Sequence, residues 1–144
     1  MLTPLLTQAA ILLPVLAHMG LVLGLYAWLT VARAQAVRAG LVRYNAFEFA
    51  DADPPVVARI TRNLANQFEL PVLFYAAVLA LMQLQAVTAL DVGLGWAFVL
   101  GRVAHSGVQT LTGDVRLRGL VFAVNFLAVL GVLLHLATVA LRAL

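Results

Sequence analysis

The sequence contains no cysteine and no lysine, and it has few charged residues of any kind. The lack of cysteine excludes disulfides, thiolate metal sites and a cysteine nucleophile within these 144 residues. Charged residues make up 10% of the chain and hydrophobic residues 64%, whereas a soluble domain is about one quarter charged. The mean hydropathy is +1.02. We therefore expect a single domain, residues 1–144, for which water is not the main solvent.

Long apolar runs predict helices that cross a bilayer. Three runs contain no Asp, Glu or Arg: residues 1–32, 70–90 and 119–141. Each reaches the roughly 20 apolar residues that are needed to cross a hydrocarbon core of ~30 Å. A fourth apolar stretch, between Asp91 and Asp114, is interrupted by Arg102 and His105. Because a chain in lipid must satisfy its own backbone hydrogen bonds, the predicted fold is all-α, an integral membrane four-helix bundle.

The second predicted helix is longer than a bilayer requires. Asp53 followed by Pro54 and Pro55 is typical of an N-cap and a first helical turn. The helix is expected to start near Pro55 and to continue to about Gln85. Pro71 should bend it locally, because proline removes one backbone donor.

The arginines predict the orientation of the helices. The connection between the first two predicted helices carries Arg33, Arg38, Arg43, Arg59 and Arg62, and the last connection carries Arg116 and Arg118. The opposite side has only Arg142. The excess of positive charge on the cytoplasmic side of membrane proteins therefore predicts cytoplasmic arginine-rich loops and termini on the non-cytoplasmic side.

Two stripes of polar residues fall inside or beside the predicted spans. The second helix carries Arg59, Arg62, Asn66 and Glu69 at spacings of three, four and three, and the third carries Arg102, His105 and Gln109 at three and four. Such spacings place side chains on one helical face. Ionisable groups in a membrane are costly and mark functional sites, so the stripes are predicted to face each other across a cavity. The structural alternative is that Glu69 pairs with Arg62 or Arg102 and cements the bundle.

The remaining polar residues give weaker indications. His18, His135 and Asn125 each stand alone on an apolar run and are expected to hydrogen-bond to a neighbouring helix. The three histidines lack the spacing of metal ligands, so no metal site is predicted. No nucleic-acid motif and no glycine-rich phosphate loop is present, so no nucleic-acid partner is expected.

The chemistry of the stripes indicates a small anionic ligand that also carries an amine. Arginine holds carboxylates with paired hydrogen bonds, and Glu69 could receive an ammonium group. Glutathione has this pattern of groups together with a thiol, and a nearby arginine can stabilise a thiolate. A hydrophobic small molecule could reach the same place from the bilayer.

Two segments resemble one known family. Residues 59–71 (Arg-Ile-Thr-Arg-Asn-Leu-Ala-Asn-Gln-Phe-Glu-Leu-Pro) and 101–106 (Gly-Arg-Val-Ala-His-Ser), followed by Arg116-Leu-Arg118, are similar to the MAPEG family. The name stands for membrane-associated proteins in eicosanoid and glutathione metabolism. The resemblance covers nearly the whole chain. It implies a homotrimer that holds glutathione between subunits near the cytoplasmic face.

The resemblance also implies roles for individual residues. It gives glutathione binding to Arg33, Arg62, Asn66, Glu69 and His105, with Arg33 offered across the subunit boundary. It gives Arg118 the catalytic role of polarising the thiol.

The chain departs from the family pattern at four positions, which keeps several functions open. Active members often have tyrosine at the positions of Gln109 and Phe122, a serine at Gly119 and an arginine at Ala65. The leading hypothesis is a glutathione-dependent transferase or peroxidase that acts on hydrophobic electrophiles. The alternative is a non-catalytic lipid-binding or scaffold protein. A transporter that uses Glu69 is a third hypothesis, which the position of this residue in the cytoplasmic half disfavours.

Overall fold

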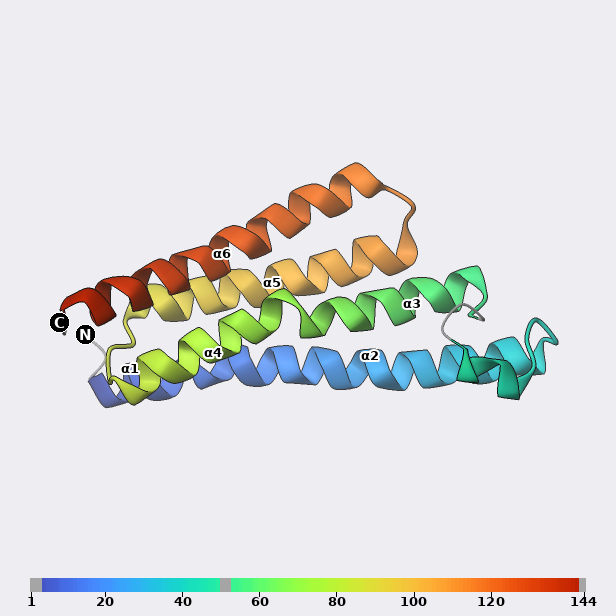
Figure 1. Cartoon of the computed structure of the whole chain (residues 1–144), viewed down its shortest axis with the longest axis horizontal. Coiled ribbons are helices and arrows are strands. Elements are labelled where there is room, and N and C mark those ends of the chain that lie inside the picture. Colours follow the sequence, from blue (N-terminus) through green and yellow to red (C-terminus); the bar gives the residue numbers. More distant parts are fainter. Residues whose placement is uncertain (1–3, 50–52, 143–144) are drawn as a thin grey trace.

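All the secondary structure of the described residues is helical. A computed structural model describes residues 4–49 and 53–142, so the first three and last two residues of the predicted domain lie outside the described residues. The elements are α1 (Pro4–Ala10), α2 (Leu12–Arg38), η1 (Tyr44–Glu48), α3 (Pro55–Ala65), η2 (Asn66–Phe68), α4 (Leu70–Gln83), α5 (Ala89–Leu111) and α6 (Val115–Arg142). The helices run side by side along one axis (Figure 1). These residues contain no strand, which confirms the all-α prediction.

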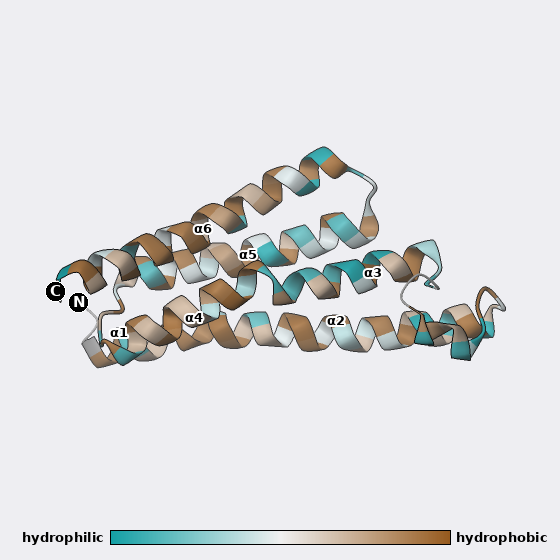
Figure 2. Cartoon of the chain, in the orientation of Figure 1, coloured by the Kyte–Doolittle hydropathy of each residue, from teal (hydrophilic) through white to brown (hydrophobic). Residues whose placement is uncertain are grey.

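Three segments are long and apolar enough to cross a membrane. They are Leu5–Arg38, Pro55–Gln83 and Val115–Arg142. The 23-residue α5 is not among them, since Asp91, Arg102 and other polar side chains lower its hydropathy. Figure 2 shows apolar residues along α6, α4 and much of α2, while polar residues gather on α3 and the adjoining half of α5. A crossing by α5 therefore stays a prediction.

The arrangement of the connections agrees with the pattern of arginines. Pro4 and Arg142, the described ends of the chain, lie at one end of the bundle, and the α2–α3 and α5–α6 connections lie at the other (Figure 1). The two arginine-rich connections therefore share an end. Which side of the membrane this end faces stays a prediction.

Apolar packing holds the helices together near the described termini. A buried cluster includes Phe74 from α4, Phe98 from α5, Val129 and Val132 from α6, and Ile11 from the turn between α1 and α2. The rings of Phe74 and Phe98 stack at 4.4 Å between centroids. This cluster fixes α4 against α5 and α6.

The predicted second helix is broken, which corrects the expectation of a continuous helix from Pro55 to Gln85. It begins at Pro55 as predicted, but α3 ends at Ala65, the turn η2 follows, and α4 ends at Gln83. Glu69 has φ −98° and ψ −101°, outside the helical region. Pro71 lacks an N–H and its ring clashes with the carbonyl four residues earlier, so the disturbance starts before the proline.

Asp53 is not the helix N-cap that the sequence predicts. The N-cap is Pro54, which cannot cap with its side chain. The Asp53 carboxylate instead accepts hydrogen bonds from Arg33 Nη2 at 3.1 Å and Nε at 3.3 Å, and from the Thr61 hydroxyl. An ion pair with α2 thus takes the place of a cap.

Gly101 allows a close approach between α5 and α6. A Cβ atom at this position would lie 2.3 Å from Asn125 Oδ1, whereas one at Gly107 on the same helix would meet no atom within 4 Å. We expect Gly101→Ala to lower the free energy of unfolding by about 1–3 kcal/mol through overpacking. The matched Gly107→Ala should be neutral or stabilising by up to about 1 kcal/mol, because alanine favours helix. Thermal unfolding in detergent measures both, and equal effects would contradict this packing.

Candidate functional site

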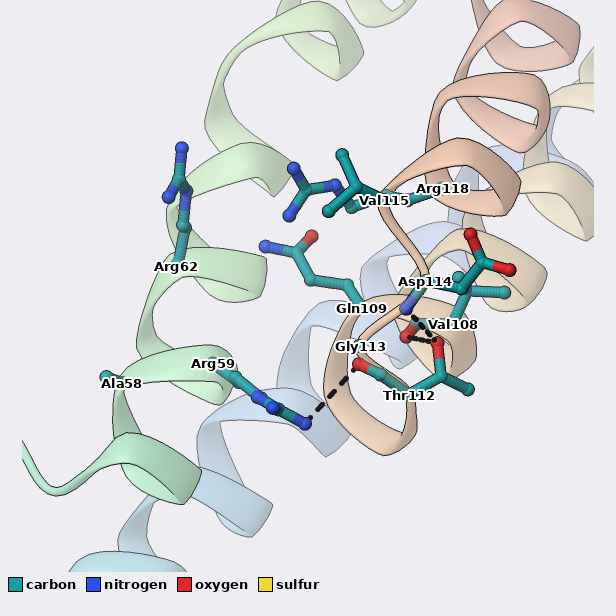
Figure 3. Close-up of a pocket in the computed structure, with 10 residues that line it drawn as sticks. All are labelled: Ala58, Arg59, Arg62, Val108, Gln109, Thr112, Gly113, Asp114, Val115 and Arg118. Carbon is teal, nitrogen blue, oxygen red and sulfur yellow. Dashed lines mark hydrogen bonds between the residues drawn. The ribbon is translucent and has the colours of Figure 1, made fainter.

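Two adjoining cavities lie where α3 meets the α5–α6 turn, and together we call them the arginine pocket. The first has a volume of about 290 Å³ and is drawn in Figure 3. Its lining is Ala58, Arg59, Arg62, Val108, Gln109, Thr112, Gly113, Asp114, Val115 and Arg118. The second has a volume of about 280 Å³ and is lined by Arg62, Asn66, His105, Val115, Arg118, Gly119 and Phe122. Arg62 and Arg118 line both cavities and join them.

The turn between α5 and α6 brings Arg118 to α3. Asp114 Oδ1 accepts from the Leu117 N–H at 2.9 Å, which starts α6 with a capped first turn. Arg59 Nη1 donates to the Thr112 carbonyl at 3.3 Å and ties α3 to this turn. In Figure 3 the Arg118 side chain extends from α6 toward α3, above Gln109.

The charge of the arginine pocket is positive. Three guanidinium groups line it, from Arg59, Arg62 and Arg118, and Asp114 is the only carboxylate among its described lining residues. That carboxylate caps α6 and points away from Arg62 and Arg118 in Figure 3. Grouped guanidinium groups favour carboxylates and phosphates, so the pocket is suited to an anion.

Arg102 is a buried cation beneath the pocket. It is 1% exposed, and its Nε and Nη2 donate to Gln67 Oε1 at 3.0 and 2.8 Å. Nη2 also donates to the Asn66 carbonyl at 2.7 Å, at the break between α3 and α4. The hydrogen bonds of Arg102 to the described residues therefore go to neutral groups, and they stabilise the irregular backbone that carries Asn66.

Gln67 is the centre of this buried network. Its Oε1 also accepts from His18 Nε2 at 3.0 Å, and its Nε2 donates to Asn63 Oδ1 at 3.2 Å and Ser106 Oγ at 3.3 Å. With His18 donating through Nε2, its Nδ1 accepts from the Tyr75 hydroxyl. The Gln67 amide joins α2, α3 and α5 directly, and the His18 ring extends the network to Tyr75 on α4.

The hydrogen bonds predicted for the three isolated polar residues are found for two of them and not for the third. The hydrogen bond predicted for His18 to a neighbouring helix is confirmed, and so is that of His135, whose Nδ1 lies 2.9 Å from Asp91 Oδ1. The prediction for Asn125 is wrong: its amide is buried and has no hydrogen-bond partner among the described residues. It packs against Gly101 instead.

The two polar stripes face each other, as predicted. Gln109 Oε1 accepts from Asn63 Nδ2 and Asn66 Nδ2, both at 3.1 Å, and so joins α5 to α3. His105 is 3% exposed and its ring centroid lies 6.2 Å from that of Phe122 on α6. Its Nδ1 has no hydrogen-bond partner in the part of the chain that the structure describes.

Four of the six residues singled out from the sequence come together in one chain. Arg62, Asn66, His105 and Arg118 line the arginine pocket. Glu69 is exposed and lines neither cavity, because the helix break separates it from the face that carries Arg62. Arg33 is held by Asp53 and lines a different cavity.

Sequence reasoning missed Gln67 and Tyr75 as parts of the site's support. Gln67 lies four residues after Asn63, so a second polar stripe at helical spacing was present in the sequence. Nothing in the local sequence distinguishes Tyr75.

Among the described residues, no group of three or more His, Asp or Glu could hold a metal ion.

The apolar helices and the position of the pocket indicate the general class of this protein. Three of the described segments are long and apolar enough to span a bilayer, and an arginine-lined pocket lies at one end of the bundle, so the chain is of the integral membrane class. The chain belongs to the MAPEG family, whose profile matches residues 11–138 of the 144. No curated protein and no solved structure matches the chain. This membership confirms the resemblance inferred from residues 59–71 and 101–106.

Proposed function

We propose that this protein is a glutathione-dependent membrane transferase or peroxidase that acts on hydrophobic electrophiles. The observation that carries the proposal is the convergence of Arg62, Asn66, His105 and Arg118 on one positively charged pocket. Membership of a family associated with glutathione and eicosanoid metabolism supports the choice of ligand. We also propose four membrane spans, with α5 as the fourth, and a cytoplasmic position for the pocket.

The pocket offers groups for the carboxylates and the peptide groups of glutathione. Arg59 and Arg62 can bind its carboxylates through paired hydrogen bonds. The Asn66 amide and the free Nδ1 of His105 can bind its peptide groups. These interactions would hold the tripeptide with its thiol toward Arg118.

Arg118 would stabilise the thiolate, which is the nucleophilic form of the sulfur. In transfer, the sulfur forms a bond to the electrophilic carbon, and the leaving group departs with its bonding electron pair and takes up the thiol proton. In peroxide reduction, the sulfur takes the terminal oxygen, which releases an alcohol. A second glutathione then converts the sulfenic acid to the disulfide and water.

The hydrophobic substrate would enter from the lipid side of α6. Phe122 lines the pocket and is 42% exposed, and Val115 and Gly119 lie on the same wall. Gly119 leaves this wall open, since a Cβ there would meet no atom within 4 Å. An apolar opening beside a polar binding site suits a substrate that dissolves in the bilayer.

Arg33 and Glu69 fit the proposal only if copies of the chain assemble. Both lie outside the arginine pocket of their own chain. We propose a homotrimer in which the site lies between subunits, so that one of these residues could reach a neighbour's pocket. The Arg33–Asp53 ion pair would then orient Arg33 at the subunit boundary.

Glutathione binding is the first step to test. Isothermal titration in detergent should detect binding by the wild type, and Arg62→Ala should weaken it about 10–100-fold, since a charge-assisted hydrogen bond contributes about 1.5–3 kcal/mol. Arg43→Ala removes an exposed arginine that does not line the pocket and should bind as the wild type does. No heat at millimolar glutathione, or equal affinity for Arg62→Ala, would overturn the proposal.

A second candidate function is a non-catalytic lipid-binding or scaffold protein. The observation that favours it is that Gln109 Oε1 already accepts from Asn66, so one of the proposed ligand-binding groups is engaged within the chain. Lipid that copurifies with the protein, together with no turnover of thiol and electrophile, would favour this function over the enzyme.

A further inference from the structure

A separate cavity of about 720 Å³ lies between the last turns of α2 and η1. It shares no lining residue with the arginine pocket. The lining is Thr30, Arg33, Ala34, Val37, Arg38, Tyr44, Asn45, Phe47 and Glu48. We call it the α2–η1 cavity. The end of α2 and η1, which supply this lining, are at the right of Figure 1.

The cavity is lined by one cation and one anion that have no partner among the described residues. Arg33 is already neutralised by Asp53 and lies over the Phe47 ring, with its guanidinium carbon 4.9 Å from the ring centroid. The other two charged lining residues, Arg38 and Glu48, are exposed and form no hydrogen bond or ion pair with the described residues. One free cation and one free anion complement a zwitterion better than an anion.

An exposed apolar row leads away from the cavity along α2. Leu16, Met19, Leu23 and Tyr26 are all exposed, at spacings of three, four and three, and Thr30 in the cavity follows four residues later. At 1.5 Å per residue, the 14 steps from Leu16 to Thr30 span about 21 Å. That exceeds half of the ~30 Å hydrocarbon core, which is the depth of an acyl chain in one leaflet.

The surroundings of η1 place the cavity at the level of lipid headgroups. Leu41, Tyr44 and Phe49 are 69%, 82% and 70% exposed, beside the exposed Arg43. Aromatic side chains and arginines concentrate at the boundary between lipid tails and water. The segment therefore has the composition of an element that rests on the membrane surface.

We propose that the α2–η1 cavity binds the headgroup of a zwitterionic phospholipid with a primary amine, of the phosphatidylethanolamine class. Its phosphate binds Arg38, its ammonium group donates to Glu48, and one acyl chain lies along the row from Tyr26 to Leu16. A choline headgroup lacks the N–H groups that Glu48 requires, and an anionic glycerol headgroup leaves Glu48 without a cation. The two residues that bind this headgroup, Arg38 and Glu48, take no part in the proposed glutathione site.

Lipid binding can be measured on the whole protein by native mass spectrometry after titration with phosphatidylethanolamine, phosphatidylcholine or phosphatidylglycerol of identical acyl chains. The wild type should prefer phosphatidylethanolamine. Arg38→Gln should weaken its binding about tenfold or more, as expected for loss of a charge-assisted hydrogen bond. Glu48→Gln should abolish the preference for phosphatidylethanolamine over phosphatidylglycerol. A nonspecific basic surface would show no such preference in the wild type.

Arg43→Gln is the matched control, because Arg43 is exposed on the same loop but does not line the cavity. It should bind lipid as the wild type does. Equal losses for Arg38→Gln and Arg43→Gln, or a wild-type preference for phosphatidylglycerol, would overturn the proposal. So would a change of oligomeric mass without loss of lipid in Arg38→Gln, since that result would mean that a second copy of the chain covers the cavity.

Discussion

Replacing Gln67 with leucine is expected to lower the free energy of unfolding by about 3–5 kcal/mol, as for a buried charge that loses its partner. Gln67 Oε1 accepts two hydrogen bonds from Arg102 and one from His18. Leucine would leave the Arg102 guanidinium, which is 1% exposed, with only the Asn66 carbonyl among the described partners. The Gln67 amide donors to Asn63 and Ser106 would be lost at the same time.

Two further variants make this result specific. Gln83→Leu changes the same residue type at an exposed position near the end of α4 and should be close to neutral. Gln67→Glu keeps the acceptor oxygens for Arg102 and should be less destabilising than Gln67→Leu. The measurement is unfolding in detergent, followed by circular dichroism. If Gln67→Leu and Gln83→Leu unfold alike, Arg102 is not held by Gln67.

Replacing Arg118 with alanine is expected to lower kcat for a chromogenic electrophile by about 10²–10³-fold, which is the usual cost of removing one group that stabilises developing charge. Arg118 lines both cavities of the arginine pocket and reaches toward α3 above Gln109 (Figure 3). No other cation from α6 lines the pocket among the described residues. The thiol would therefore lose the group that stabilises its thiolate.

Arg116 supplies the control for Arg118. It lies two residues earlier on the first turn of α6, is exposed and does not line the pocket, so Arg116→Ala should leave kcat unchanged. Arg118→Lys keeps a cation and should retain part of the activity. A variant Arg118→Ala with normal kcat but a raised KM would show that Arg118 binds glutathione without activating it.

The sequence predicts the helices well because their signals are local. Apolar runs and flanking prolines depend only on neighbours in the chain, and α3 starts at Pro55 as expected. The spacing of Arg59, Arg62 and Asn66 correctly predicts a polar face, and Gln109 meets it. Each of these predictions requires information about a single helix only.

The features that the sequence does not predict depend on contacts between helices. Glu69 leaves the stripe because the helix breaks at residues 66–69, and Arg102 binds the Asn66 carbonyl at that break. Asp53 binds Arg33 on α2 rather than capping α3. The spacing of residues along a single helix carries no information about the neighbouring helix or about a break in the helix. It therefore cannot predict where these side chains lie.

The support of the pocket and its chemistry are linked through one backbone segment. Asn66 presents its side chain to the pocket and to Gln109, while its carbonyl is held by the buried Arg102. The residues beneath the pocket therefore fix the geometry of the residues that line it. Mutations at Gln67 are expected to affect ligand binding even though Gln67 does not line the pocket.

The most direct test of the proposed function is an experimental structure of the protein with glutathione. We expect ligand density in the arginine pocket, with carboxylates against Arg62, peptide groups beside Asn66 and His105, and the sulfur next to Arg118. A pocket without density at saturating glutathione, or glutathione bound elsewhere with its sulfur far from Arg118, would contradict it.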